Sequence, residues 1–327
     1  MTLLLILGLI APVQDAGLQL RERNLAVMGT ELELKVLGED PAKLEIALDA
    51  ATAEIRRVED VMTDWRPSPL TRLNEMAGAG PIVVEPELAQ LIQRGLEIGY
   101  LTEGAFDISY AGAGVLWDFK RTPPQIPSAE AIEASLSHVD YRRVRVDLEE
   151  NSVLLPEGMR LGLGGIAKGY GVDRTMAILL EHGIEHGMVS AGGDLKVLGR
   201  KFGELWQIAI RHPRDRERVL AVLPVSNTCV MTSGDYERFF IHDGVRYHHI
   251  LDPRTGRPAT GCMSATVVAQ NAAYADSLAT ALCVLGPEEG IALVDSLRGV
   301  EALVVGLNGK PLVSNGLRGA EKPSKKD

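Results

Sequence analysis

Residues 160–173 read RLGLGGIAKGYGVD, and this glycine-rich stretch lies between a predicted strand pair and a predicted helix. Two short alternating runs within residues 141–155 predict a hairpin, and residues 166–182 predict the helix. Glycine lets the backbone approach a ligand closely, the first turn of a helix offers unpaired amides, and Lys168 adds a positive charge there. The junction therefore suits a pyrophosphate group, although a tight turn with close helix packing explains the same pattern.

A nicotinamide-binding domain is a second interpretation of this stretch. Gly162, Gly164 and Ala167 match the dinucleotide fingerprint G-x-G-x-x-A, a short pattern that often occurs by chance. Such a domain requires a regular βαβ unit and an acidic residue about 20 positions on. The next acid at a strand end, Asp194, lies about 30 positions away, which argues against this interpretation.

Outward from the junction, strands and helices alternate without a fixed repeat. Residues 41–62 repeat apolar side chains at intervals of three and four, which predicts a long helix with one buried stripe. Further helices are predicted at 86–104 and 272–285, and strands at 30–37, near 189, and at 206–211, 219–225 and 247–251. Paired strands between helices favour an α+β fold with mixed, largely antiparallel sheets flanked by helices.

Composition restricts the class of partner. Of 327 residues, 46% are apolar, so the chain can bury a substantial core. The net charge is −10, with 34 basic against 44 acidic residues, which argues against a nucleic acid partner. A phosphate-bearing ligand therefore requires a metal ion or backbone amides. Cys229, Cys262 and Cys283 have no metal-ligand spacing, and we expect buried free thiols.

The two ends of the chain differ from the rest. Residues 1–16 contain a short apolar run that fits a secretory signal cut near Ala16, although no Lys or Arg precedes it and an N-terminal strand or membrane-skimming helix is the alternative. We expect export to the periplasm or the outer face of the inner membrane. No cysteine follows the run, which argues against a lipoprotein anchor. Residues 17–318 form the expected folded region, and the charged tail 319–327 is expected to be disordered.

Asp276 and Thr280 stand four positions apart on a predicted apolar helix, so they share one face. A carboxylate and a hydroxyl oxygen are hard ligands suited to Mg²⁺, and an unpaired carboxylate among apolar residues is costly to bury. The alternative is that Asp276 caps the amides at the start of its own helix.

Histidines and aromatic residues supply further candidates. His248 and His249 precede an Asp-Pro turn, and one of them is a candidate base, while the other is expected to be a buried, hydrogen-bonded imidazole. With His242 they lack a zinc-site spacing, and no G-x-S-x-G elbow is present. Trp65 and Phe106 are loop aromatics that can stack on a flat heterocycle or anchor a domain interface.

Several motifs occur together in one order: MGT, WRPSPLTRLN, EGAFD, LWDF, LGGIAKGYGVD, SAGGD, TSGDYERFF, HHILDPRTGRP and ADSLATAL. This set resembles the ApbE family of FAD:protein FMN transferases over residues 25–313. The resemblance implies a two-domain, T-fold-related α+β protein that binds FAD and Mg²⁺. It also implies cleavage of the FAD pyrophosphate and attachment of FMN to a Thr or Ser of an acceptor protein, such as a subunit of a membrane redox complex.

The resemblance also assigns roles to individual residues. Met28 is placed against the flavin, Trp65 near the ligand, Lys168 at the nucleotide, and Ile250 with His249 on a strand beside the cofactor. The FAD-binding loop is Ala105, Phe106 and Asp107. The metal ligands are the carbonyl near Gly165 and the side chains of Asp276 and Thr280. From these positions we hypothesise that Asp276 acts in catalysis through the metal and that His249 is the base for the acceptor hydroxyl.

One position departs from the family pattern. Gly162, at a position expected to contact FAD, stands where the family usually has an acid, and Ser190 stands where Asn is common. Two alternatives stay open beside FMN transfer. One is an Mg-dependent FAD pyrophosphatase, in which water replaces the acceptor hydroxyl at the same site and FMN and AMP are released. The other, motivated by the loss of the acid, is a non-catalytic FAD-binding protein.

Overall fold

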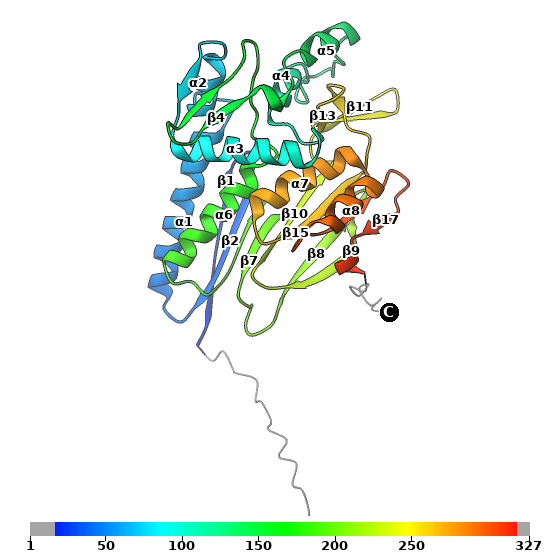
Figure 1. The fold of residues 1–327 in the computed structure, drawn as a ribbon. Coiled ribbons are helices and arrows are strands. Elements are labelled where there is room, and N and C mark those ends of the chain that lie inside the picture. Colours follow the sequence, from blue (N-terminus) through cyan, green and yellow to red (C-terminus); the bar gives the residue numbers. More distant parts are fainter. Residues whose placement is uncertain (1–16, 319–327) are drawn as a thin grey trace, which may run out of the picture.

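The computed structural model describes residues 17–318, and an eight-stranded sheet forms its centre (Figure 1). Each strand of this sheet pairs with its neighbours in the antiparallel sense. In spatial order the strands are β1 (Gln19–Val27), β2 (Thr30–Gly38), β6 (His186–Ala191), β7 (Asp194–Leu198), β10 (Thr228–Gly234), β15 (Ser264–Ala269), β16 (Glu301–Val305) and β17 (Pro311–Val313). The predicted α+β class is confirmed.

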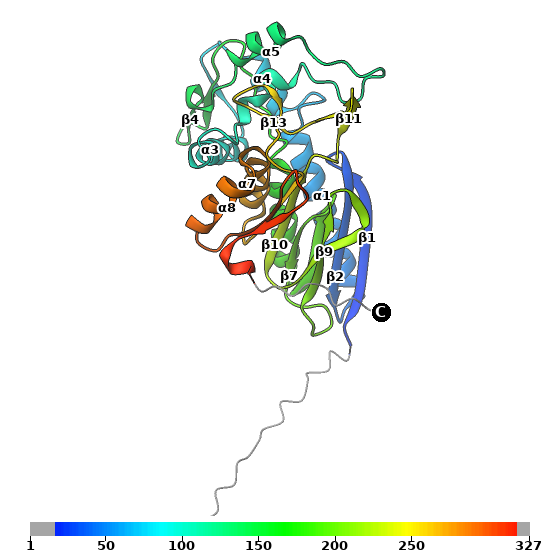
Figure 2. The same ribbon diagram turned by 90° about the vertical axis from the view of Figure 1, so that its right-hand side faces the viewer.

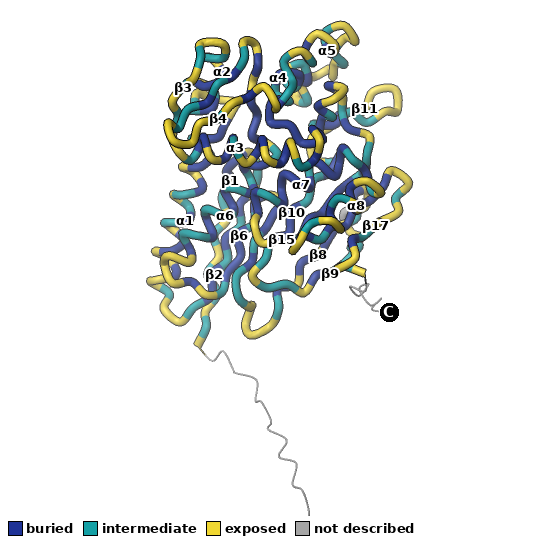
Figure 3. Tube along the Cα trace, viewed as in Figure 1, coloured by how far each residue is buried: buried dark blue, intermediate teal, exposed yellow. Residues whose placement is uncertain are grey.

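Helices cover one face of this sheet. The layer contains α1 (Pro41–Met62), α6 (Ala167–Glu181), α7 (Ala272–Leu285) and α8 (Pro287–Ser296). The apolar stripe of α1 is fully buried, as its periodicity predicts, and α7 is buried almost all round because it lies between the sheet and α3 (Pro86–Leu101). Figure 3 shows α7 and the central strands beneath it among the most deeply buried parts of the chain, whereas α1 and α8 each keep an exposed side.

A long hairpin covers the opposite face of the sheet. It consists of β8 (Trp206–His212) and β9 (Asp215–Val225), and the prediction for the second strand began four residues too late. Trp206 and Ile208 pack on Leu37, Met188 and other side chains that point away from the helices. The sheet therefore has a hydrophobic core on each face.

The remaining elements gather beyond one end of the sheet (Figures 1 and 2). They include α3 and three groups of short elements. The first group is α2 (Pro69–Glu75), β3 (Pro81–Val83), β4 (Arg145–Asp147) and β5 (Ser152–Leu154). The second is η1 (Ile108–Tyr110), α4 (Ala111–Gly114), α5 (Ala129–Leu136) and η2 (Tyr141–Arg143). The third is β11 (Phe239–His242), β12 (Val245–His248), β13 (Leu251–Asp252) and β14 (Arg257–Pro258). A small aromatic core around Trp117, Phe240 and Leu251 joins the last two groups.

Several boundaries test the sequence predictions. The helices at 41–62 and 272–285 begin and end where predicted, and the predicted hairpin is β4 with β5. The second helix ends at Leu101, before the turn that contains Glu103 and Gly104, both with positive φ. The predicted strand 247–251 is wrong as one element, because His249 and Ile250 lie between β12 and β13.

Two further expectations concern the cysteines and the ends of the chain. Cys229, Cys262 and Cys283 are buried free thiols, as expected. The predicted signal segment 1–16 and tail 319–327 lie outside the described residues. Between residues 17 and 318, no helix has the length and apolar character that a membrane crossing requires.

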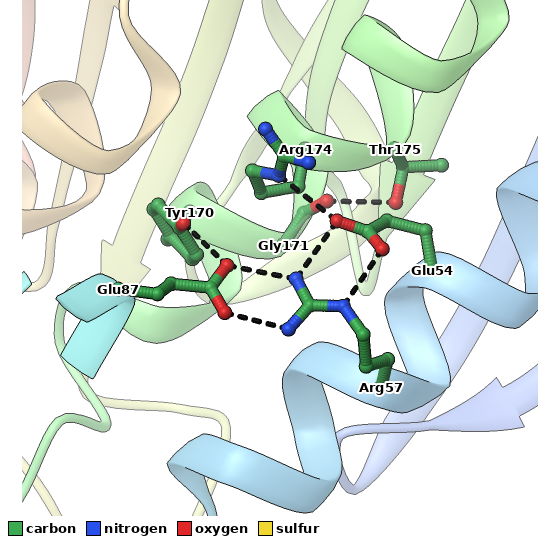
Figure 4. A network of polar contacts seen from close by, with 7 residues as sticks. All are labelled: Glu54, Arg57, Glu87, Tyr170, Gly171, Arg174 and Thr175. Carbon is green, nitrogen blue, oxygen red and sulfur yellow. Dashed lines mark hydrogen bonds and ion pairs between the residues drawn. The ribbon is translucent and has the colours of Figure 1, made fainter. Parts of the chain in front are cut away.

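A polar network ties α1, α3 and α6 together at the surface (Figure 4). The Arg57 guanidinium donates to both oxygens of Glu54 and both oxygens of Glu87, at 2.6–2.9 Å. Tyr170 donates to Glu87 at 2.5 Å, and Arg174 donates to Glu54 at 2.9 Å. Hydrogen bonding by Arg57 lowers the pKa of Glu54 to about 2.

We expect Arg57→Met to lower the free energy of unfolding by about 1 kcal/mol at pH 7, a modest loss because Arg57 is 44% exposed. Since the folded pKa of Glu54 lies below its usual 4.5, its stabilising contribution is complete above pH 4.5 and disappears as the pH falls towards 2. Urea unfolding across this range measures the difference. Arg56→Met, at an exposed position, is the matched control. A loss in Arg57→Met that does not shrink in acid would contradict the assignment.

Candidate functional site

A cleft of about 350 Å³ opens where the sheet meets the elements beyond its end. Its walls come from the β1–β2 turn, the end of α1, the loop before η1, the start of α6, β10 and α7. The predicted site residues that line it are Met28, Trp65, Ala105, Phe106, Asp107, Gly165, Lys168, His249, Ile250, Asp276 and Thr280. Residues as far apart as Met28 and Thr280, which are 252 positions apart, are therefore brought to one cleft, and of the predicted set only Gly162 lies outside its lining.

The glycine junction allows the close approaches that build the cleft floor. A Cβ atom at Gly165 would lie 2.9 Å from the ring of Phe106 and 3.2 Å from the Thr280 hydroxyl. A Cβ at Gly169 would lie 2.2 Å from the carbonyl oxygen of Ala272. Both explanations of the glycine-rich stretch therefore hold: Gly169 allows close helix packing, and Gly165 leaves its backbone open to the cleft.

Asp276, on α7, links this helix to α6 at the point where the two helices cross. Its side chain is 3% exposed, and one carboxylate oxygen accepts a hydrogen bond of 2.9 Å from the backbone N–H of Gly169. Asn271 caps α7, so the alternative that Asp276 caps its own helix is wrong. Burial raises the pKa of Asp276, and the positive charge of Lys168 opposes that rise. The carboxylate thus caps the first turn of α6 instead.

Asp276, Thr280 and Gly165 line the cleft together, and each carries an oxygen that can bind a metal. The second oxygen of Asp276 and the carbonyl oxygen of Gly165 accept no hydrogen bond from the described part of the chain, and Thr280 shares a 3.2 Å contact with the Ser233 hydroxyl. Carboxylate, carbonyl and hydroxyl oxygens are the donors that Mg²⁺ takes in proteins, with water and substrate phosphates completing the shell. Residues 17–318 contain no cluster of three His, Cys, Asp or Glu side chains that would hold a metal by themselves. The donor set therefore fits a hard cation bound together with a phosphate ligand.

Lys168 places a positive charge on the cleft wall. Its ammonium group forms an ion pair with the buried carboxylate of Asp194, which also accepts a 2.7 Å hydrogen bond from the N–H of Thr232. Burial opposes the charge on Lys168, but Asp194 and Asp276 outweigh it, and its pKa lies above the ordinary value. Asp194, whose spacing argued against a nicotinamide-binding domain, thus positions Lys168 at the cleft.

The histidine pair divides as expected. His248 is buried and its Nε2 contacts the carbonyl of Ala259 at 2.8 Å, whereas His249 lines the cleft. Nδ1 of His249 is buried and has no hydrogen-bond partner in the described chain. Burial, followed by the nearby charge of Arg238, lowers the pKa of His249 to about 3. His249 is therefore neutral at pH 7, and its low pKa makes it a weak base unless a nearby negative charge raises that pKa.

The predicted FAD-binding loop and the rim residue Trp65 differ in their exposure and contacts. Phe106 is buried and packs against Gly165, while Trp65 is 60% exposed at the rim of the cleft. Asp107 turns its carboxylate inward, accepting hydrogen bonds from the N–H and hydroxyl of Ser109 and from the N–H of Tyr141. Its side chain thus holds the loop in shape, although Asp107 lines the cleft.

Gly162 has a different environment from the one expected. Its N–H donates to the carbonyl of Ile108 at 2.7 Å, and a Cβ there would lie 2.9–3.0 Å from the ring of Tyr110. Tyr110 itself lines the cleft, and burial raises its pKa to about 12. The tyrosine ring therefore fills the space that a larger side chain at position 162 would need.

Restoring the acid that the family usually has is expected to be harmful in this chain. Gly162→Asp should lower the free energy of unfolding by about 2 kcal/mol, because the ring of Tyr110 must move. Tyr110→Ser removes that ring, so the double variant should lose less than the sum of the two single losses. Urea unfolding of the four proteins measures this coupling, and strictly additive losses would show that the ring and position 162 do not compete.

Several residues that line the cleft were not predicted as site residues from the sequence. Tyr110, Asp64 and Arg238 line the cleft, as does Ser233, which contacts Thr280. Ser233 and Arg238 fall within the quoted motif TSGDYERFF, so the motif contained them without indicating their roles. Tyr110 lies just outside every quoted motif.

Known proteins are similar to this chain over most of its length. A model of the ApbE family matches residues 28–304. A relative named FAD:protein FMN transferase from Treponema pallidum is 35% identical over 298 residues, which cover 85% of this chain and 82% of the relative. A relative of the same name from Vibrio cholerae is 32% identical over 305 residues, or 90% and 89% of the two chains.

Solved structures share the fold over nearly the whole chain. The crystal structure of an ApbE protein from Thermotoga maritima superposes with a TM-score of 0.85 at 34% identity, covering 93% of this chain and all of that one. The apo flavinyl transferase ApbE of Pseudomonas stutzeri gives a TM-score of 0.82 at 28% identity, covering 93% and 97%. With the match to the family model, these similarities show that the chain belongs to the ApbE family.

Proposed function

We propose that this protein is an Mg²⁺-dependent FAD:protein FMN transferase. The observation that carries the proposal is the convergence of Asp276, Thr280 and the Gly165 carbonyl with Lys168 in one cleft. The names of the relatives support the activity, since proteins covering most of this chain are called FAD:protein FMN transferase.

The cleft residues divide the work of binding the pyrophosphate. Asp276, Thr280 and the Gly165 carbonyl would hold Mg²⁺, and a bound Mg²⁺ supplies positive charge that offsets the charge developing on the phosphate oxygens. Lys168, held by Asp194, adds a fixed cation on the same wall. In the first turn of α6 the N–H groups of Ala167 and Gly169 are already bonded to Leu163 and Asp276, so the N–H of Lys168 is the one left to face an anion. Together they offset the acidity of the chain at this one place.

The transfer exchanges the phosphoanhydride bond of the FAD pyrophosphate for a phosphoester bond to the acceptor. The acceptor hydroxyl oxygen forms a bond to the FMN-side phosphorus, and the bond from that phosphorus to the bridging oxygen breaks, so that AMP leaves with the bridging oxygen. The hydroxyl proton passes to the neutral ring of His249 and then to water. The anionic pyrophosphate in the cleft would raise the low pKa of His249 and make it a better base.

The proposal extends to the acceptor and the cellular location. The acceptor is a protein with a Ser or Thr flavinylation site, such as a subunit of a membrane redox complex, and the sequence of residues 1–16 supports export. Amino-terminal sequencing of protein from the periplasmic fraction would test this, with a mature start near residue 17 expected and retention in the cytoplasm contradicting it.

Mass spectrometry tests the activity. The purified protein is incubated with FAD, Mg²⁺ and a small acceptor domain that a known transferase modifies, with and without a chelator. We expect one FMN added to the acceptor and loss of that addition under chelation. Free FMN and AMP with an unchanged acceptor would instead indicate a pyrophosphatase, and intact FAD would indicate a binding protein.

A further inference from the structure

A second hollow continues the cleft outward along the end of β1. It is lined by four successive residues of the strand, Asn24 to Val27, and by Glu31. Gly29, Thr30, Glu59 and Trp65 line both this groove and the cleft. Because side chains of successive strand residues point to opposite faces, a hollow bordered by four in a row follows the backbone edge of the strand. The groove therefore leads along an open strand edge into the cleft.

The edge of β1 that borders the groove is free of a partner strand in the described chain (Figure 2). β1 and β2 are joined by the two-residue turn Met28-Gly29, with φ of 52° and 70°, and Val27 pairs with Thr30. In such a hairpin the flanking pair is hydrogen-bonded, and the pattern alternates along the strand. The N–H and C=O groups of Asn24 and Ala26 therefore point away from β2, into the groove.

The two halves of this edge differ in charge. The outer half contains Arg21, Glu22 and Arg23, which pair with charges on α1 and β2. The half beside the cleft, Asn24 to Val27, is neutral. Natural proteins protect exposed strand edges with charges, so an unprotected stretch of edge marks a place where another strand can add.

We propose that the acceptor protein docks by adding an extended, Ser- or Thr-bearing segment to the β1 edge at Asn24 and Ala26. This inference rests on the proposed transferase function. The segment pairs with the free backbone groups, and its hydroxyl residue passes Gly29 into the cleft. Trp65, 60% exposed between groove and cleft, is an anchor for the segment. The ionisable lining residues are Glu31 and Glu59, so the segment is neutral or basic.

Proline substitutions along the edge test the docking. Ala26→Pro and Asn24→Pro each remove one outward N–H and leave the bonds to β2 in place. Each should raise the KM for the acceptor domain about tenfold, with the FAD Kd and the kcat at saturating acceptor unchanged. The N–H of Glu22 also points away from β2, but Glu22 lies outside the groove. Glu22→Pro should therefore leave the KM unchanged. Circular dichroism melting confirms that each variant is folded.

Hydrogen exchange on a chain without an edge substitution gives an independent measurement. In the Asp276→Ala variant, which should bind the acceptor without turnover, the amides of Asn24 and Ala26 should become protected when the acceptor domain is added, and that of Glu22 should not. A wild-type KM in Ala26→Pro, or protection confined to other surfaces, would overturn the docking. Protection of Ala26 without acceptor, together with a dimer by light scattering, would assign the edge to a second copy of the chain. If the wild type adds no FMN to the acceptor, the transferase function itself fails.

Discussion

Replacing Asp276 with Ala should reduce FMN transfer about a thousandfold or more, the largest catalytic effect we expect of any single substitution. The substitution removes the only carboxylate among the three candidate metal-binding groups, and with it the group that would bind Mg²⁺ most strongly. Transfer at saturating FAD and acceptor, measured over a range of Mg²⁺ concentrations, gives both the loss and any shift in the metal requirement. Activity above a tenth of the wild-type value would reject the metal assignment.

Asp276→Asn separates the charge from the structural role. The amide oxygen can still accept the hydrogen bond from Gly169, so the crossing of α6 and α7 is kept while the metal-binding charge is lost. We expect its activity to be nearly as low as that of Asp276→Ala, with no loss in melting temperature, since an ionised carboxylate is costly to bury.

Asp173 provides a matched control on the same pair of helices. Its carboxylate accepts hydrogen bonds from the N–H groups of Ala272 and Ala273 and pairs with Lys196, but it does not line the cleft. Asp173→Asn should therefore lower stability by about 1 kcal/mol and leave the Mg²⁺ dependence of transfer unchanged. A shifted metal requirement in this control would mean that general disturbance of the helix pair explains the Asp276 result.

The helices were the part of the fold that the sequence predicted best. Two helices, 41–62 and 272–285, were predicted to the residue, the first from apolar side chains repeated on one face and the second from a long run that is apolar nearly all round. Helical spacing also placed Asp276 and Thr280 on one face. It did not predict that Asp276 caps Gly169, because that contact joins positions 107 residues apart and depends on how two helices cross.

The loops were harder to predict because a polar side chain in a loop can hydrogen-bond either to nearby backbone groups or to a distant residue or ligand. Asp107 occurs in a loop that the family resemblance assigns to FAD, yet its carboxylate binds Ser109 and Tyr141 within the protein. Short acidic side chains readily bond to amides two or three positions away, and no periodicity shows which choice is made. Gly162 is similar: its departure from the family pattern was visible in the sequence, but the ring of Tyr110 that occupies the space was not.

Gly169→Ala should give the largest loss of stability among the substitutions considered, about 3 kcal/mol. A methyl group there would lie 2.2 Å from the carbonyl oxygen of Ala272 and 2.8 Å from Cα of Ala273, both backbone atoms that cannot rotate away. Overpacking of this kind costs about 1–3 kcal/mol or more, which outweighs the gain of about 1 kcal/mol from replacing glycine in a helix. Urea unfolding measures the change.

Gly171→Ala, one half-turn further along α6, controls for the helix propensity. There the new methyl group meets the ends of two flexible side chains, Met28 at 3.1 Å and Ile55 at 3.3 Å, so the net change should lie within about 1 kcal/mol of zero. Equal stability of the two variants would show that α6 and α7 separate at little cost. If Gly169→Ala is the less stable, its transfer activity should fall too, because α7 then carries Asp276 and Thr280 away from the Gly165 carbonyl. Stability and catalysis thus depend on the same close crossing, which only glycine at position 169 permits.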